Sequence, residues 1–226
     1  MQQSHFKPIS IAQLSALGLP EIPFEYAEEA YPNSSVPLLF KSEQGLEWRS
    51  VNFGLIPKWA EDRSIAQKTY NCRNETLLEK PSFSEAAYKC KFGAIVVSEF
   101  YESKYIDSKP QRWGVRRKDG QAFFIAALYE ICRLKDGQGT EEIVRSASMI
   151  TMDAIDHAMM KEFHEPGPVK RSVIVIPHAR LDEWLSLKTP NIHSFVQGFP
   201  LDEFECSHVP KAKIEKVSPQ LNFFDL

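Results

Sequence analysis

Three polar clusters in this chain could do chemistry, and each lies at the end of a segment predicted to be a strand. The first is the hexad Asn71-Cys72-Arg73-Asn74-Glu75-Thr76, the second is Glu-Phe-Tyr-Glu at 99–102, and the third is His-Glu-Pro-Gly-Pro at 164–168. A carboxylate and an imidazole brought together by a sheet can move protons near neutral pH, while an amide or guanidinium holds a substrate group. Taken singly, each cluster is more typical of a solvated strand end or loop than of a catalytic site.

The elements that must position these clusters are mostly strands. Apolar or alternating runs predict strands over 36–40, 46–55, 91–97, 121–128, 144–152 and 172–177, and helices over 11–17, 81–89 and 180–187. Turn signals at 118–120 and 135–139 are of the kind that close hairpins. Because strands outnumber helices and rarely alternate with them, we expect an α+β fold. Its core would be a mainly antiparallel mixed sheet, or barrel-like, with a few flanking helices.

Length and charge restrict the class of protein. The 226 residues, of which 43% are hydrophobic, suit one domain over 1–226, with 207–226 as a possible C-terminal tail and two small domains as the alternative. The formal net charge of −3 gives no global basic field, so a nucleic-acid partner would need a local patch. Two candidate patches are the basic residues around Trp113 and the pair Lys170-Arg171, and both are also compatible with ordinary strand ends.

Metal, cofactor and membrane sites are not indicated. The four cysteines form no CxxC pair and have no His at metal spacing, so we expect neither a metal site nor a cofactor. No apolar run reaches the length of a signal peptide or of a membrane span, which is about 20 residues for a helix. A soluble, cytoplasmic protein without a membrane partner is expected.

Read in order, the motifs of the chain resemble the SOS-response-associated peptidase (SRAP) family. The resemblance covers roughly residues 30–187 and rests on Gly-Leu-Ile-Pro-Lys-Trp-Ala at 54–60, the hexad with Lys-Pro-Ser-Phe at 80–83, Phe-Tyr-Glu at 100–102, Leu-Tyr-Glu at 128–130, Ile-Thr-Met-Asp-Ala at 150–154, and His164. Members of this family recognise abasic sites in single-stranded DNA and form a covalent DNA-protein crosslink. The resemblance implies a bacterial or phage-like protein that is nucleoid-associated when bound to DNA.

The resemblance also implies roles for individual residues. In the family, removal of the initiator Met exposes a Cys whose amine and thiol close a thiazolidine on the sugar aldehyde. Asn71 matches the residue that positions the N-terminus, Glu102 the residue that moves protons, and His164 the residue that assists opening of the sugar ring. The implied DNA contacts are Arg73 on a phosphate, Trp59 in the groove, Pro32 in a short loop, Thr151, and Trp113 if its hairpin brings it close.

The family's N-terminal Cys is absent, because Gln2 and Gln3 occupy the candidate positions. A terminal amine, with a pKa near 8, could still form a reversible imine with an aldehyde. We keep open an altered or misassigned N-terminus, a non-covalent binder of abasic DNA, and a thiol or self-processing peptidase that acts on protein. Rescue by Cys72 requires its side chain to face the site, whereas strand alternation turns it away from the side of Asn71 and Arg73.

The C-terminal residues carry a second, separate motif. Gln220, Leu221, Phe223 and Phe224 resemble the short peptide with which bacterial repair proteins bind the replication sliding clamp. The alternative is a C-terminal segment packed on its own domain. Loss of clamp binding on deletion of 220–226 would distinguish them.

Overall fold

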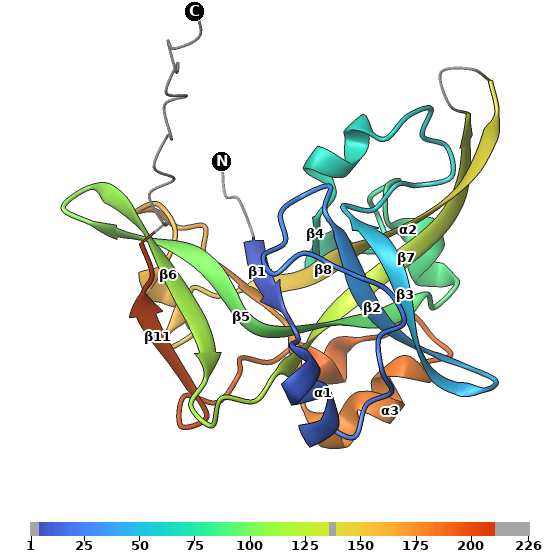
Figure 1. The fold of residues 1–226 in the computed structure, drawn as a ribbon. Helices are drawn as coiled ribbons and strands as arrows, with labels where there is room; N and C mark the ends of the chain where they lie inside the picture. The colour runs from blue at the N-terminus through green and yellow to red at the C-terminus, as the bar shows by residue number, and fades with distance from the viewer. Residues whose placement is uncertain (1–4, 136–138, 211–226) are drawn as a thin grey trace, which may run out of the picture.

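A computed structural model describes residues 5–135 and 139–210 (Figure 1). The strands are β1 (His5–Pro8), β2 (Ser35–Ser42), β3 (Gly45–Phe53), β4 (Asn71–Arg73), β5 (Phe92–Ile106), β6 (Lys109–Arg117), β7 (Phe123–Lys135), β8 (Glu141–Asp153), β9 (Arg171–Val173), β10 (Val175–Ile176) and β11 (Phe204–His208). The α-helices are α1 (Ile11–Ala16), α2 (Ser84–Tyr88) and α3 (Leu181–Leu185). Short 3-10 helices are η1 (Ser64–Lys68), η2 (Asn74–Thr76), η3 (Met160–Glu162), η4 (His178–Arg180) and η5 (His193–Phe195).

Five strands close into a barrel. Strand β7 pairs with β8, β8 with β3, β3 with β2, β2 with β5, and β5 returns to β7. All these pairs are antiparallel except β3 with β8, and β4 adds a second parallel pair on β8. The predicted α+β class with a mainly antiparallel, barrel-like core is therefore confirmed.

The two larger of three apolar clusters take alternate residues of the barrel strands, as the two-residue period of a strand requires. One takes Leu38, Phe53, Ile95, Ile125 and Met149, one from each barrel strand, and fills the interior. The other takes intervening strand residues together with side chains of α1, α2 and α3, so these helices pack on the outer surface.

Strand β5 continues beyond the barrel into an arm, which is the small sheet formed by the second half of β5 with β6 and β11. Its first half, Phe92–Val97, pairs with β7, and Phe100–Ile106 pairs with β6, which in turn pairs with β11 (Figure 1). The turn at 118–120 was predicted to close a hairpin, and this is wrong, because β6 and β7 lie one after the other along β5 instead of pairing. The segment 135–139 does connect a hairpin, in which Lys135 of β7 is paired with Glu141 of β8.

Several predicted boundaries also differ from the structure. The helix expected over 81–89 is limited to α2, and that over 180–187 is η4 followed by α3. The strand expected over 172–177 is split, because β9 pairs with β8 whereas β10 pairs with β7. Strands β1, β6 and β11 were not predicted, since they are short or polar and receive their register from neighbours distant in sequence.

Some predictions fall outside the part of the chain that the structure describes. These are Gln2 and Gln3 at the N-terminus and the clamp motif of Gln220, Leu221, Phe223 and Phe224. Over residues 5–135 and 139–210, no helix is long and apolar enough to cross a membrane. Within the same residues, no group of three or more His, Cys, Asp or Glu side chains is arranged to hold a metal ion.

Candidate active site and DNA-binding surface

The hexad begins as β4, whose side chains alternate between two environments. Cys72 is fully buried in the cluster that packs the helices, while Asn71 is half-buried and Arg73 is exposed. Burial, followed by the negative charge of Glu75, raises the pKa of the Cys72 thiol well above its ordinary value. The alternation expected from the sequence is thus observed, and the thiol of Cys72 is unsuited to act as a nucleophile.

Glu75, the carboxylate of the hexad, is engaged in the structure of the domain. It receives two hydrogen bonds of 2.9 Å from the Arg171 guanidinium and one of 3.0 Å from the backbone N–H of Asp153. Burial alone would raise the pKa of Glu75, but the bonds from Arg171 and its charge lower it overall. This bidentate pair ties the hexad to β9, the strand that follows the third polar cluster.

Thr151 belongs to the same network. Its hydroxyl donates to the carbonyl of Cys72 at 3.2 Å, and the Arg171 guanidinium donates to both the hydroxyl and the carbonyl of Thr151. The side chain is buried. The structure gives Thr151 an internal role, and its predicted contact with DNA remains a prediction.

Glu102 and His164, from the second and third clusters, lie side by side. The Nε2 atom of His164 is 3.4 Å from Oε2 of Glu102, and the His164 side chain is 2% exposed. The backbone N–H of His164 donates to the carbonyl of Ser103 at 2.6 Å, which fixes the histidine to β5. A long bond of 3.5 Å from the N–H of Arg171 to Nδ1 makes Nδ1 the acceptor and assigns the proton to Nε2, facing Glu102.

Tyr70 links this pair to the hexad. Burial raises the pKa of the Tyr70 phenol, and the negative charge of Glu102 raises it further, so the two side chains share one electrostatic environment. Arg171 gives a direct link, because its guanidinium binds Glu75 of the hexad and its N–H points to Nδ1 of His164. The structure therefore brings Glu102 and His164 together and connects the hexad to them through Arg171, while the place of Asn71 at this site remains a prediction.

The N-terminal strand β1 reaches the same place. It runs antiparallel to β5 with His5 opposite Tyr101, one residue before Glu102. The His5 ring is stacked between Tyr31, at 5.1 Å, and Tyr101, at 4.9 Å. The Arg112 guanidinium lies over the Tyr101 ring, 3.6 Å from its centre. This stack holds the start of β1 against β5.

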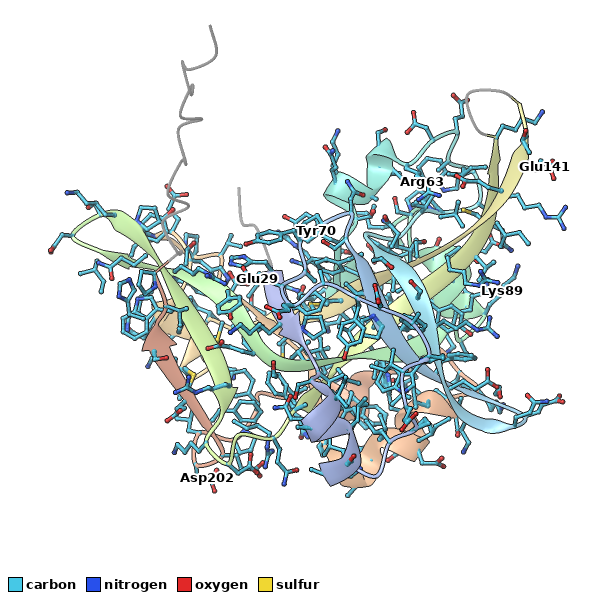
Figure 2. All side chains as sticks on the ribbon, viewed as in Figure 1. Glu29, Arg63, Tyr70, Lys89, Glu141 and Asp202 are labelled. Atoms are coloured by element: carbon cyan, nitrogen blue, oxygen red, sulfur yellow. The ribbon has the colours of Figure 1, made fainter. Side chains whose placement is uncertain are left out.

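Glu29 connects the members of the stack. Its carboxylate accepts hydrogen bonds from the Tyr31 hydroxyl and from Arg112, and lies 3.7 Å from Nε2 of His5. In Figure 2, Glu29 and Tyr70 are both on the side of the molecule from which β1 enters. This assembly was not expected from the sequence, although the acidic segment 25–29 followed by Tyr31-Pro32 is a signal that could have indicated it.

Comparison with known proteins shows the family of the chain. The sequence profile of the family described as SOS response associated peptidase (SRAP) matches residues 14–217. The chain belongs to the SRAP family. It is 28% identical to the abasic site processing protein YoqW of Bacillus subtilis over 197 residues, which are 84% of this chain and 82% of YoqW. It is also 28% identical to YoaM, an abasic site processing protein of the same organism, over 79% of this chain and 75% of YoaM.

Solved structures share the SRAP fold at lower identity. A protein from Bordetella bronchiseptica superposes with a TM-score of 0.82 at 23% identity, covering 91% of this chain and 99% of that one. A protein from Bacteroides thetaiotaomicron gives a TM-score of 0.72 at 20% identity, with 92% of each chain covered. At this identity the likeness concerns the fold alone.

The aromatic residues predicted to contact DNA in this SRAP protein differ in exposure. Trp59 is 57% exposed, and its indole N–H donates to the carbonyl of Pro81 at 3.1 Å, which fixes the ring on the surface. Trp113 is half-buried, with the Lys104 ammonium 5.0 Å from its ring centre and His208 against it. Trp59 is therefore the more accessible of the two rings, and the predicted contacts of both with DNA remain predictions. Pro32, half-buried, follows Tyr31 of the stack.

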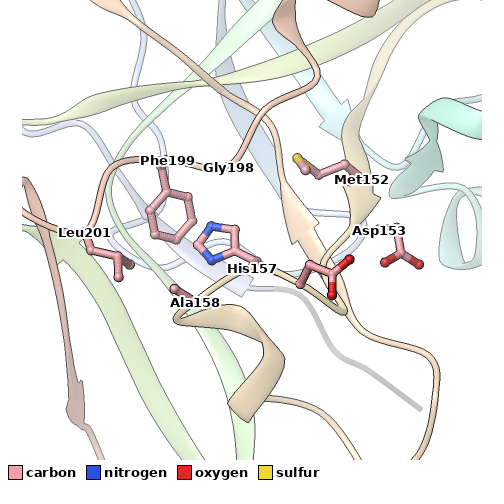
Figure 3. A pocket seen from close by; sticks show the side chains of 8 residues that line it. Met152, Asp153, His157, Ala158, Gly198, Phe199 and Leu201 are labelled. Carbon is pink, nitrogen blue, oxygen red and sulfur yellow. The ribbon is translucent and has the colours of Figure 1, made fainter.

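Apart from the Glu102–His164 pair, a hollow of about 490 Å³ lies between the end of β8 and residues 198–201 (Figure 3). His157 is its central polar residue, and its Nδ1 accepts bonds from the N–H groups of Met159 and Met160. Burial lowers the pKa of His157, which favours the neutral ring that this capping role needs. The hollow shares no lining residue with the Glu102–His164 site, so we assign it no part in the chemistry.

Proposed function

We propose that this chain recognises abasic sites in single-stranded DNA and that Glu102 and His164 act on the aldehyde form of the damaged sugar. The proposal is supported by membership of the SRAP family and by the names of its relatives in Bacillus subtilis. The observation that carries it is the Glu102–His164 pair at 3.4 Å, next to the residue of β5 that faces the start of β1.

The reaction proposed at this site is imine formation. An α-amine, with a pKa near 8, is partly neutral at pH 7 and adds to the carbonyl carbon of an open abasic sugar. The two hydrogens of the amine and the carbonyl oxygen leave as water, and a C=N bond remains. Glu102 takes the protons from the amine nitrogen in turn and delivers them to the departing oxygen, while the Nε2–H of the neutral His164 ring donates a hydrogen bond to that oxygen.

Closure of a thiazolidine requires a thiol beside the amine. The sequence has Gln2 and Gln3 there, and the Cys72 thiol is buried with a raised pKa. The imine is therefore proposed as the covalent state of this chain. Removal of an initiator Met in general requires a small second residue, and Gln2 is bulky, so the nucleophile is proposed to be a terminal amine without an adjacent thiol.

The surrounding residues are proposed to hold the strand and the terminus. Asn71 would orient the terminal residue, exposed Arg73 would pair with a phosphate near the lesion, and Trp59 would stack on a base. Pro32 would line the entry beside the His5 stack. These assignments give the local cationic and aromatic surface that a chain of net charge −3 needs to bind single-stranded DNA.

Borohydride trapping tests the proposal. The purified chain, with its N-terminus determined by mass spectrometry, is incubated with abasic and intact single strands of equal length, with and without reductant. We expect an adduct only with the abasic strand and only with borohydride, and a loss of about 10²-fold or more in its rate of formation with Glu102→Gln or His164→Gln. Glu165→Gln, a nearby exposed carboxylate, is the matched control.

The alternatives give different results in the same experiment. A stable adduct without reductant would show that a thiol takes part, contrary to the proposal. Preference for the abasic strand without any adduct would support the non-covalent binder, for which the absence of Cys at positions 2 and 3 is the favouring observation. Equal, weak binding of both strands would overturn the proposed function.

A further inference from the structure

Lys170 is a buried lysine that the proposed reaction does not use. Its residue is 9% exposed, and among the described residues no carboxylate lies within ion-pair distance of its ammonium. Instead, Nζ donates to the carbonyl of Phe163 at 2.7 Å and to that of Glu165 at 3.3 Å. These two carbonyls belong to the residues on either side of His164.

The backbone at His164 needs an external restraint. Its φ of 67° is in the left-handed region, which costs a non-glycine residue roughly 1 kcal/mol or more. The five residues after it, 165–169, are all exposed, and three of them are Pro166, Gly167 and Pro168. A loop with so few packed side chains cannot by itself hold a buried imidazole in a strained conformation.

Besides the bond from the His164 N–H to Ser103 of β5, Lys170 supplies a second restraint, from the side of β8. The N–H of Ala154, directly after β8, donates to the carbonyl of Lys170 at 3.0 Å, and the next residue, Arg171, is paired with Asp153 of β8. The backbone of Lys170 is thus fixed to the barrel, and its side chain reaches back to the opposite stem of the loop. The same short segment also directs the N–H of Arg171 to Nδ1 of His164.

We infer that Lys170 is a positioning residue, whose ammonium clamps the carbonyls of Phe163 and Glu165 and thereby holds the His164 imidazole against Glu102. A positive charge suits this place, since an ammonium has three donors and no acceptor and can bind both carbonyls at once. The expected effect of Lys170 on the rate of adduct formation rests on the proposed function. The clamp itself concerns only the conformation of His164 and does not depend on that function.

The test compares Lys170→Met with Lys161→Met, which removes an exposed lysine of η3 and serves as the matched control. With Lys170→Met we expect borohydride-trapped adduct at saturating abasic DNA to form about 10-fold more slowly, with little change in the DNA concentration for half-saturation. In a His164→Gln background the same substitution should change the rate by less than about twofold, because the two residues act as a unit. Lys170→Arg, which keeps the charge and the donors, should restore part of the rate.

Spectroscopy separates positioning from a general loss of structure. The ¹⁵N shifts of the His164 ring should report a proton on Nε2 in the parent chain, and Lys170→Met should change that pattern while Lys161→Met does not. In the parent chain, the Lys170 ammonium should show scalar couplings to the carbonyl carbons of Phe163 and Glu165, a measurement that needs no folded variant.

Three results would overturn the inference: absence of those couplings, an unchanged His164 spectrum with a normal rate in Lys170→Met, or an equal loss of rate in the His164→Gln background. If the parent chain forms no adduct and shows no preference for abasic DNA, the proposed function fails, and the clamp is then decided by the couplings and the His164 spectrum alone.

Discussion

Cys72 shows how a reactive residue type can be placed where it cannot react. It stands between Asn71 and Arg73 in the most polar stretch of the chain, yet its side chain is fully buried among apolar residues. Removing a thiolate from water is unfavourable, so its pKa is raised, and the adjacent Glu75 charge adds to the effect. The thiol therefore contributes to packing.

Alkylation measures this directly. In the native protein we expect iodoacetamide to modify half-exposed Cys206 well before Cys72, and Cys72 to react only on unfolding. Mass spectrometry of the peptide that contains residue 72, sampled over time, gives both rates. Cys72→Ala should leave the borohydride-dependent adduct unchanged, and a loss of that adduct in a folded Cys72→Ala variant would mean that the thiol takes part in the chemistry.

Glu29 predicts a dependence of stability on pH. Burial would raise its pKa, but the hydrogen bonds from Tyr31 and Arg112 and the nearby charges of Arg112 and His5 lower it below the ordinary value of 4.5. A carboxyl with a depressed folded-state pKa stabilises the fold above its unfolded pKa, and this contribution is lost as pH falls through the folded value. We expect Glu29→Gln to lower the free energy of unfolding by about 1–2 kcal/mol at pH 7.

The difference in free energy of unfolding between the parent chain and Glu29→Gln should shrink as pH falls below about 4.5. Denaturant unfolding of the two proteins across that pH range measures it. Glu28→Gln, an exposed neighbour, is the control. A difference between Glu29→Gln and the parent chain that stays constant from pH 7 down to pH 3 would contradict the assigned charge network.

At the scale of elements, Gly54 fixes the connection between β3 and the polar hexad. Its φ is 121°, and a Cβ built there would lie 2.3 Å from the backbone oxygen of Ala66 in η1. The next residue donates its N–H to Thr69, so this close approach sets where the chain returns toward β4. Gly is required both by the conformation and by the absence of space.

Gly54→Ala should therefore cost more than conformational strain alone. Gly120 also has positive φ, 73°, but a Cβ there meets nothing within 4 Å. We expect Gly120→Ala to destabilise by about 1–2 kcal/mol and Gly54→Ala by about 2 kcal/mol more, because a backbone atom must move. Denaturant midpoints at constant m-value give both numbers, and equal losses would show that the contact with Ala66 relaxes freely.

An element can be predicted from the sequence when its own residues carry the pattern, and it cannot when its place depends on distant segments. Barrel strands such as β7 and β8 have long apolar runs, so their existence was predictable. Strand alternation likewise predicted that the Cys72 side chain faces away from the side of Asn71 and Arg73. Strand β6, which contains Arg112, Arg116 and Arg117, has few apolar residues, and its register comes from β5 and β11. The His5–Tyr31–Tyr101 stack joins three distant segments, which no local pattern encodes.

At the scale of the whole molecule, the barrel provides a rigid frame and the site is assembled at one end from its connections. Glu102 comes from the part of β5 that has left the barrel, and His164 from a loop clamped back to β8. Asn71, whose part in the site is a prediction, comes from a short strand on β8. The order of the motifs could be recognised from the sequence. Their convergence depends on a change of pairing partner along β5, from β7 in its first half to β6 in its second, and no motif indicates this change.

The net charge of the molecule determines how its binding to DNA should depend on salt concentration. With a net charge of −3, long-range attraction does not favour DNA, so binding must come from a few local contacts and should be weak in its dependence on salt. Each phosphate neutralised on a single strand contributes about −0.7 to the slope of log K against log salt concentration. If Arg73 contacts one phosphate, Arg73→Gln should reduce the slope by about 0.7 and weaken binding to abasic and intact strands alike.

Arg133→Gln is the matched control, because it removes the same charge from an exposed position on β7, where the Arg133 side chain is 73% exposed. Fluorescence anisotropy of a labelled abasic strand between about 20 and 200 mM salt gives the slopes, a range in which the Debye length falls to below about 10 Å. Arg73→Gln and Arg133→Gln with the same slope as the parent chain would place the phosphate contacts elsewhere. A slope reduced equally by both variants would show that binding responds to total charge, so that the local surface around Arg73 has no special part in it.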